Sequence, residues 1–301
     1  MREALGENPY ELKNIIEKWI LSDNEEMQII PTDSIVMTID KEAVRRSGMM
    51  IADDSIPDVM HISLKGKRAV YKSELMIYEM LCRTNWERPL YIACTVGSDN
   101  YGSLGNNLVS EGLAERITPF NTASSGKTID TKRMYDNVMN KYKFGGIDNP
   151  DIYLDETVTR MCLTHRRMFA TLAMELMREG DNDRALKVVK RAEKAIPPTT
   201  VPHSYMGGSM DLARVWLLLG HNKEAEDIVL SIARNACEYL EWYSHMNSRM
   251  LQMNARDVVY SCYMLNSAVE ILQDAESDKA AEMSKKLSTY TERFEQYIKY
   301  L

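Results

Sequence analysis

The sequence is poor in cysteine and has no long apolar run. Its 301 residues include five cysteines, and no two of them form a Cys-x-x-Cys pair. This spacing excludes a zinc ribbon and a thioredoxin-type redox motif, and an odd number of scattered thiols favours a reducing compartment over a disulfide framework. No segment reaches the roughly 18 consecutive apolar residues that a membrane-spanning helix needs, and the N-terminus has no apolar signal region. We therefore expect no membrane span in this region.

The sequence also lacks a basic surplus. Its net charge is -7 and its isoelectric point is near 5.4, so few cations are available to neutralise phosphates, and nucleic acid is excluded as a partner. Hydrophobic residues make up 45% and charged residues 27% of the chain, as in an ordinary globular protein. Phenylalanine is scarce (4) and methionine abundant (21), which indicates methionine-filled helical cores.

Motifs that would name a chemistry are absent or incomplete. The five histidines show no ligand spacing, and there is no Gly-x-Ser-x-Gly. Ser124-Ser125-Gly126-Lys127-Thr128 ends like a phosphate-binding loop, but Asn121 stands where its first glycine belongs. Asp181-Asn182-Asp183 has the Asp-x-Asp form of metal-dependent sugar transferases, yet it follows Gly180 at a predicted hairpin turn, where it would cap a helix. We expect no catalytic residue, cofactor or metal in this region.

The first half of the chain mixes helical and strand patterns. A helix is predicted over residues 9–22, strands over 34–40 and 59–64, and a helix over 73–82 with Leu75, Met76, Met80 and Leu81 inward. Pro89 prevents this helix from continuing, and residues 90–96 read as a short buried strand beyond Trp86. A short helix over 108–114, an extended segment over 114–119, a loop over 122–127 and a helix over 130–143 follow.

The second half is dominated by a helical repeat with an offset of 40 residues. Gly180 corresponds to Gly220, and the matching pairs around them are Leu172-Ala173 with Leu212-Ala213, Ala185 with Ala225 and Val189 with Val229. Each copy reads as a helix, a glycine turn and a second helix, similar to a tetratricopeptide hairpin, and a third pair is expected around Ser277-Asp278. The glycine-rich segment 144–150 is the clearest boundary. We predict an α+β fold with a mixed domain at 1–150 and a tetratricopeptide-like repeat domain at 151–301.

Stacked hairpins bury one face and expose a concave one. We place Tyr205, Trp216 and Trp242 on that face and predict that they bind a protein or peptide partner. The aromatic residues at 242–243 and 260–263 could line a peptide or sugar groove, although core packing is the simpler interpretation.

The segment Asn-Trp-Glu-Arg-Pro-Leu-Tyr-Ile-Ala at residues 85–93 resembles one found in a bacterial family of large multi-pass membrane proteins. These are similar to protein O-mannosyltransferases and carry a long soluble C-terminal region. Further matching stretches follow in the same order: residues 31–33, 39–42, 71–76, 111–116, 134–141, 144–146, 153–156 and 160–162. The resemblance covers most of residues 8–195, and helical repeats follow there as they do here.

The resemblance implies a tail and not a catalyst. In that family the membrane region is assigned the glycosyl transfer from lipid-linked donors, so it implies no catalytic residue here. We expect a non-catalytic periplasmic domain of a glycosyltransferase-like membrane protein that binds acceptor or partner proteins, or the membrane region of the same chain. The alternatives are a free-standing, cytoplasmic helical-repeat scaffold and a soluble enzyme with a pocket near Gly97.

Overall fold

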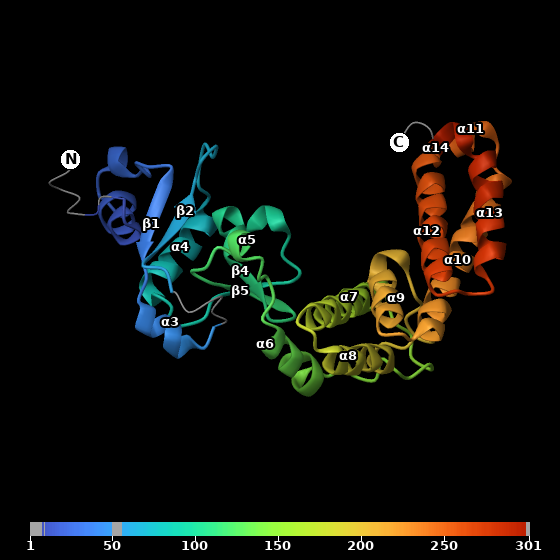
Figure 1. Cartoon of the computed structure of the whole chain (residues 1–301). Coiled ribbons are helices and arrows are strands. Elements are labelled where there is room, and N and C mark those ends of the chain that lie inside the picture. Colours follow the sequence, from blue (N-terminus) through green and yellow to red (C-terminus); the bar gives the residue numbers. More distant parts are fainter. Residues whose placement is uncertain (1–7, 9, 50–55, 299–301) are drawn as a thin grey trace. The chain divides into compact units, whose positions relative to one another are not determined.

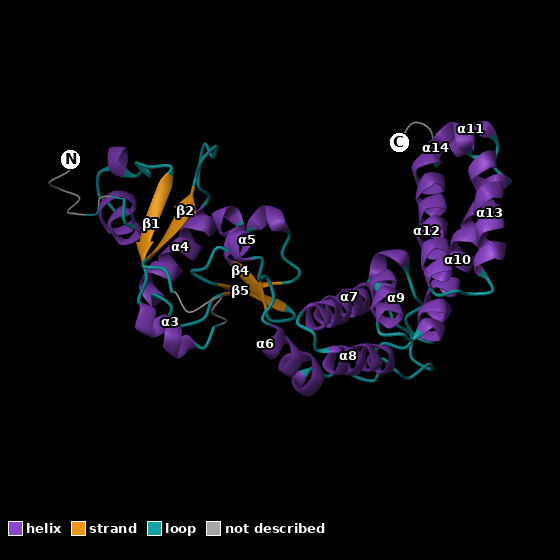
Figure 2. Cartoon of the chain, in the orientation of Figure 1, coloured by secondary structure: helices purple, strands orange, loops and turns teal. Residues whose placement is uncertain are grey.

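The computed structural model describes residue 8, residues 10–49 and residues 56–298 (Figure 1). The chain divides into two compact units, with the boundary in the sequence between Met134 and Tyr135. We call them the N-terminal unit and the hairpin unit. The fold is α+β, because both small sheets lie in the N-terminal unit and the described part of the hairpin unit is helical (Figure 2). Within the described residues, no helix is both long and apolar enough to cross a bilayer.

The N-terminal unit begins with α2 (Leu12–Asn14), which continues as the π-helix η1 (Ile15–Ile20). This confirms the predicted first helix, except that Pro9 lies outside the described residues. After η2 (Glu25–Met27), the strands β1 (Ser34–Thr38) and β2 (Val59–Ser63) pair antiparallel. Their inward residues alternate as predicted, with Ile35 opposite Ile62 in the core. Helix α3 (Lys41–Ser47) ends at Gly48, whose φ of 62° is left-handed.

Helix α4 (Lys72–Thr84) exists as predicted, but its buried face is only partly the predicted one. Tyr78 and Leu81 are buried, whereas Met76 and Met80 are exposed, so the predicted inward face was wrong for the two methionines. Apolar residues surround more than half of this helix, so their spacing alone did not select the buried face. The large aromatic ring of Tyr78 takes the core position, where it removes more area from water.

The segment after α4 turns sharply before its strand. Asn85 and Trp86 both have positive φ angles, 37° and 73°, and the Trp86 ring is buried. The strand β3 (Tyr91–Ala93) is shorter than predicted and lies at the edge of a three-stranded sheet of order β3-β5-β4. Its outer residues Tyr91 and Ala93 are exposed, so the prediction of a fully buried strand was wrong.

The central strand of this sheet, β5, forms a hairpin with the edge strand β4. The strands β4 (Leu108–Ser110) and β5 (Ala114–Ile117) pair antiparallel through a turn at Gly112. The predicted helix over 108–114 was therefore wrong, and the predicted extended segment was right. Before the hairpin lie η3 (Ser98–Asn100) and η4 (Gly102–Asn107). After it comes α5 (Thr122–Ser125), capped by Asn121, where we had expected a loop.

The hairpin unit contains three antiparallel helix pairs. They are α7 (Glu156–Arg178) with α8 (Asn182–Ala195), α9 (Ser209–Leu218) with α10 (Asn222–Ser244), and α12 (Ala255–Asp274) with α13 (Ala280–Arg293). The short elements η6 (Tyr205–Gly207), α11 (Ser248–Met253) and α14 (Glu295–Ile298) connect or end them. The eight repeat positions named above, excluding the glycines, are at most 1% exposed, which confirms that the repeat marks the core.

The segment between the two halves contains α6 (Thr131–Asp136) and the π-helix η5 (Asn137–Lys141). Phe144 packs on Phe169 of α7, with ring centroids 5.8 Å apart. Arg191 of α8 donates to the carbonyl oxygens of Val138 (3.1 Å) and Tyr142 (3.2 Å). These contacts attach the segment to the first hairpin. The domain boundary at residue 150 stays a prediction.

Candidate partner-binding site

Trp216 lies in the core of the hairpin unit. It is 1% exposed, and its Nε1 donates a hydrogen bond of 2.7 Å to Glu193 Oε1. Burial raises the pKa of the Glu193 carboxyl, while this hydrogen bond opposes the shift. Trp216 occupies the repeat position of Leu176, which is equally buried. Placing its side chain on an exposed face was therefore incorrect, because a large residue at this position fills the space between paired helices.

Tyr205 lies in η6, in the connection that leads into α9. Its ring meets two tyrosines of α12 edge-on, with centroid distances of 5.6 Å to Tyr260 and 6.0 Å to Tyr263. Its hydroxyl lies 3.4 Å from Ser267 Oγ. Burial is the main cause that raises the pKa of the Tyr205 hydroxyl, so the phenol stays protonated at neutral pH.

Trp242 is 58% exposed on α10, as a surface role requires. Its ring centroid lies 5.1 Å from that of Tyr243, which is only 6% exposed and stacks on Tyr239 at 6.5 Å. Tyr239 and Tyr243 are one helical turn apart, so they share a face of α10.

The structure brings Tyr205 together with the α10 and α12 tyrosines around one pocket. Its volume is about 290 Å³. We call it the tyrosine pocket, and its aromatic lining consists of Tyr205, Tyr239, Tyr243 and Tyr260. Trp242 stands beside this lining, in contact with Tyr243.

Polar side chains line the tyrosine pocket beside the aromatic rings. Asn235 and Asp257 line it, together with His203 and two serines. The negative charge of Asp257 adds to burial in raising the pKa of Tyr243. Among the described residues, no group of three or more histidine, cysteine or acidic side chains could hold a metal ion. The pocket offers aromatic faces, neutral hydroxyls and one carboxylate, which suit noncovalent recognition.

A buried arginine holds the wall of the pocket. Arg166 of α7 is 1% exposed and donates to the carbonyl oxygens of Ile196 (3.2 Å), Val201 (2.6 Å) and Pro202 (3.1 Å). It also donates to Ser209 Oγ at 3.3 Å. Burial lowers the pKa of Arg166 to about 10, so it remains charged at neutral pH. The connection between α8 and α9 is thereby fixed on α7.

His203 and Gly208 belong to the same connection between α8 and α9. His203 Nδ1 lies 3.2 Å from Ser209 Oγ, and burial, with the nearby Arg166, lowers the pKa of His203 to about 4. Gly208 has a φ of 75°, and a Cβ there would lie 2.5 Å from the Cα of Arg167. Only glycine fits at this point, and its conformation leads η6 into α9.

The sequence predicts Tyr205 and Trp242 as partner-binding residues, and that role stays a prediction. It assigns the aromatic residues at 242–243 and 260–263 to core packing as the simpler interpretation. The available signal was the spacing of the pairs 239/243 and 260/263, each on one helical face. No pattern in the sequence indicates that Arg166 and His203 shape the pocket. Their contacts form only because the connection between α8 and α9 packs against α7.

Comparison with known proteins gives a match in the N-terminal part of the chain. Residues 2–137 match the family model described as TMEM260-associated domain 2. This match supports a TMEM260-related family for the N-terminal region. No curated protein and no solved structure gives a significant match to the chain. The TMEM260-associated match suggests a domain of a membrane-protein family, and the tyrosine pocket lies beyond the matched residues.

Proposed function

We propose that this chain is a non-catalytic binding domain of a glycosyltransferase-like membrane protein. In this proposal it faces the periplasm, and its tyrosine pocket receives a polypeptide segment of a partner or acceptor protein. The observation that carries the proposal is the convergence of four tyrosine rings from η6, α10 and α12 on one pocket, with an exposed tryptophan beside it.

The chemistry of the pocket suits a polypeptide. Tyrosine and tryptophan offer large, amphipathic contact area at a small cost in side-chain entropy, and they are enriched at protein-binding hot spots. The volume of about 290 Å³ lies at the lower end of the range for small-molecule pockets. A space of this size accommodates one or two side chains of an extended segment.

The membrane-protein context rests on two observations. The matched family model covers the N-terminal region, and the stretches from residue 31 to residue 162 resemble the soluble tail of O-mannosyltransferase-like membrane proteins in the same order. A tail of this kind supports a role in presenting acceptors to the membrane region.

A free-standing cytoplasmic scaffold would use the same pocket. The two functions therefore differ in the side of the membrane on which the chain lies. Protease added to spheroplasts of the native organism separates them. Cleavage of a large, membrane-borne form from outside supports the periplasmic tail. A protected, soluble form of about this chain's mass would favour the scaffold.

The binding role is tested on the purified chain with a displayed library of random peptides. Peptides that bind the wild-type chain are then measured against Tyr239→Ala, which changes an exposed side chain of the lining, and Trp242→Ala, which changes the exposed side chain beside it, in contact with Tyr243. We expect each change to weaken binding about tenfold or more, as for truncated aromatic hot spots.

The matched control is Tyr153→Ala, because Tyr153 is 90% exposed and does not line the pocket. It should bind as the wild type does. If the peptides bound all three variants equally, the binding site would lie outside the tyrosine pocket. A different binding surface, or an enzymatic function, would then explain the chain better.

A further inference from the structure

The N-terminal unit holds a larger cavity of about 870 Å³. It lies between the segment that leads into β1, the loop after β2 and the first turn of α4. Its apolar wall is aliphatic and consists of Ile20, Ile29, Ile30, Leu64, Val70 and Leu75. Among the described residues no aromatic side chain lines it, so this part of the cavity offers an apolar aliphatic surface without an aromatic ring on which a planar group could stack.

The polar part of this cavity is basic. Lys67, Arg68 and Lys72 line it, against one acidic side chain, Asp33. Lys67 is paired with Glu74. Among the described residues, no carboxylate lies within ion-pair distance of Arg68 or Lys72. Arg68 and Lys72 therefore give this cavity two positive charges that no described carboxylate neutralises within ion-pair distance.

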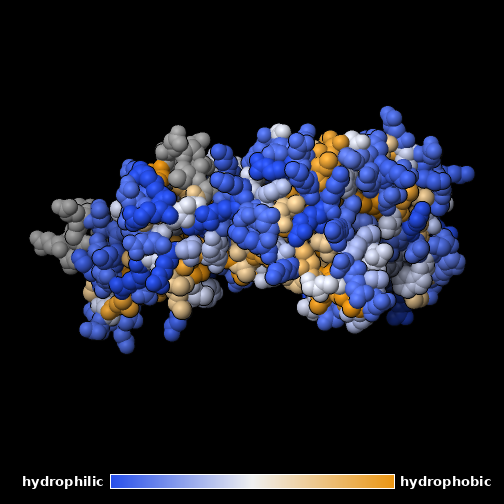
Figure 3. Space-filling model, turned by 90° about the horizontal axis from the view of Figure 1, so that it is seen from below, coloured by the Kyte–Doolittle hydropathy of each residue, from blue (hydrophilic) through white to orange (hydrophobic). Residues whose placement is uncertain are grey.

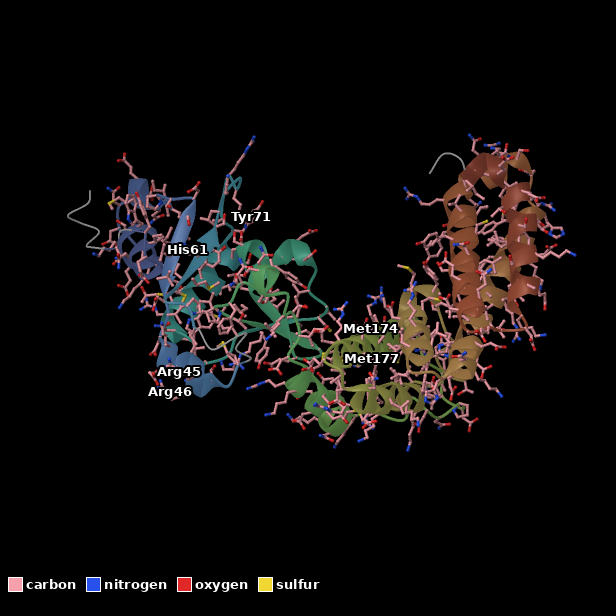
Figure 4. The ribbon with its side chains drawn as sticks, in the orientation of Figure 1. Arg45, Arg46, His61, Tyr71, Met174 and Met177 are labelled. Atoms are coloured by element: carbon pink, nitrogen blue, oxygen red, sulfur yellow. The ribbon has the colours of Figure 1, made fainter. Side chains whose placement is uncertain are left out.

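The N-terminus of α4 adds a smaller positive potential to this cavity. Its N-cap residue is Tyr71, labelled in Figure 4, and no side chain caps the helix. The positive end of the helix dipole adds to the charges of Arg68 and Lys72, while Glu74 in the same turn carries a negative charge that pairs with Lys67.

We propose that this cavity binds a small amphipathic anion. An alkyl body packs on the aliphatic wall, and an acidic head group, phosphate or carboxylate, pairs with Arg68 and Lys72. The aliphatic lining selects an alkyl chain over an aromatic ring, and the unpaired cations select an acid over a neutral or cationic head group.

This inference is independent of the proposed function, because the cavity and the tyrosine pocket share no residue and lie in different units. Loss of peptide binding at the tyrosine pocket would leave it intact.

The test is isothermal titration calorimetry of the whole chain with decyl phosphate, kept below its critical micelle concentration. Decyl maltoside and decyltrimethylammonium serve as controls with the same alkyl chain. We expect saturable binding of one decyl phosphate per chain and at least about tenfold weaker binding of both controls. Equal affinity for the three head groups would overturn the proposal.

Variants locate the site. The double change Arg68→Gln and Lys72→Gln should weaken decyl phosphate binding about tenfold or more. Asp33→Asn should tighten it, because this removes the one acidic side chain of the lining. Ile29→Asn, at an exposed position of the apolar wall, should weaken it without changing the preference for the anion.

The matched control is Lys18→Gln with Arg46→Gln, which removes the same charge from exposed positions of the same unit outside the cavity. Figure 4 shows Arg46 and Tyr71 well separated in this unit. The control should bind as the wild type does. Equal losses in both double variants, or binding to anionic vesicles without binding of monomeric decyl phosphate, would indicate general charge attraction and would contradict the proposal.

Discussion

One backbone position ends the first helix of all three hairpins in the same way. Gly180, Gly220 and Glu276 have φ angles of 82°, 79° and 54°. The next residue, Asp181, His221 or Ser277, donates its backbone N–H to the carbonyl five residues earlier, at 2.8–2.9 Å. The third hairpin thus keeps the geometry although it has lost the glycine, so Glu276 adopts a conformation that costs most residues about 1 kcal/mol or more.

Exchanging residues at this position should therefore shift stability in opposite directions. Gly220→Ala should destabilise the chain by about 1 kcal/mol, because a Cβ there meets no atom within 4 Å and only the backbone strain remains. Glu276→Gly should stabilise it by roughly 0.5 kcal/mol, since relief of strain exceeds the added entropy of the unfolded chain. Urea unfolding of both variants checks this. A stabilised Gly220→Ala would show that the turn geometry is misassigned.

His203 should make stability depend on pH in mildly acidic solution. Its pKa is lowered to about 4 in the folded chain by burial and by Arg166, whereas an unfolded histidine has a pKa near 6.5. Between these values only the unfolded chain takes up the proton. The contribution is fully present above about pH 6.5 and is lost as the pH falls toward 4, with a slope of up to about 1.4 kcal/mol per pH unit.

The measurement is the free energy of unfolding across this pH range for His203→Gln and the wild type. The variant should show a flatter profile. His245→Gln is the control, because the His245 side chain is 72% exposed and should leave the profile unchanged. Identical profiles for all three chains would mean that His203 titrates normally in the folded state.

At the scale of elements, Arg166 ties a connection to a helix. Arg166→Leu would leave carbonyl oxygens of the 196–202 segment without their donor, at about 1–3 kcal/mol for each group that water cannot reach. We expect a loss of about 3 kcal/mol or more in the free energy of unfolding. Arg160→Leu changes an exposed arginine of the same helix and should cost less than about 0.5 kcal/mol. Similar losses in both would show that the buried network contributes little.

Elements were predictable from sequence where a local pattern decided them. The repeat of Leu172-Ala173 and Leu212-Ala213 predicted two hairpins and their core, and the alternation in residues 34–40 and 59–64 predicted β1 and β2. The local pattern gave the wrong secondary structure at β4. The apolar residues 108–109 fit a helix and a strand equally, and the strand forms because it pairs with β5. The tyrosine pocket could not be predicted, because only the packing of α10 against α12 brings residue 239 near residue 260.

On the face of the molecule shown in Figure 3, the surface is mainly hydrophilic, with small scattered apolar patches. The two units each have their own buried residues, which predicts that the hairpin unit folds alone. A fragment of residues 131–301 should unfold at a higher urea concentration than one of residues 151–301. The shorter fragment loses Val138, which is fully buried, and the stacking of Phe144 on Phe169. Equal midpoints would favour the predicted boundary at residue 150.

We expect the surface at the tyrosine pocket to contact a partner protein in the cell. The most direct measurement places a photo-crosslinking amino acid at position 242 of the chain in its native organism, with position 153 as the exposed control outside the pocket. We expect a discrete crosslinked protein from position 242, whose yield falls when Tyr239→Ala is added, and none from position 153. Crosslinks of equal yield from both positions, or no crosslink at position 242, would contradict the claim.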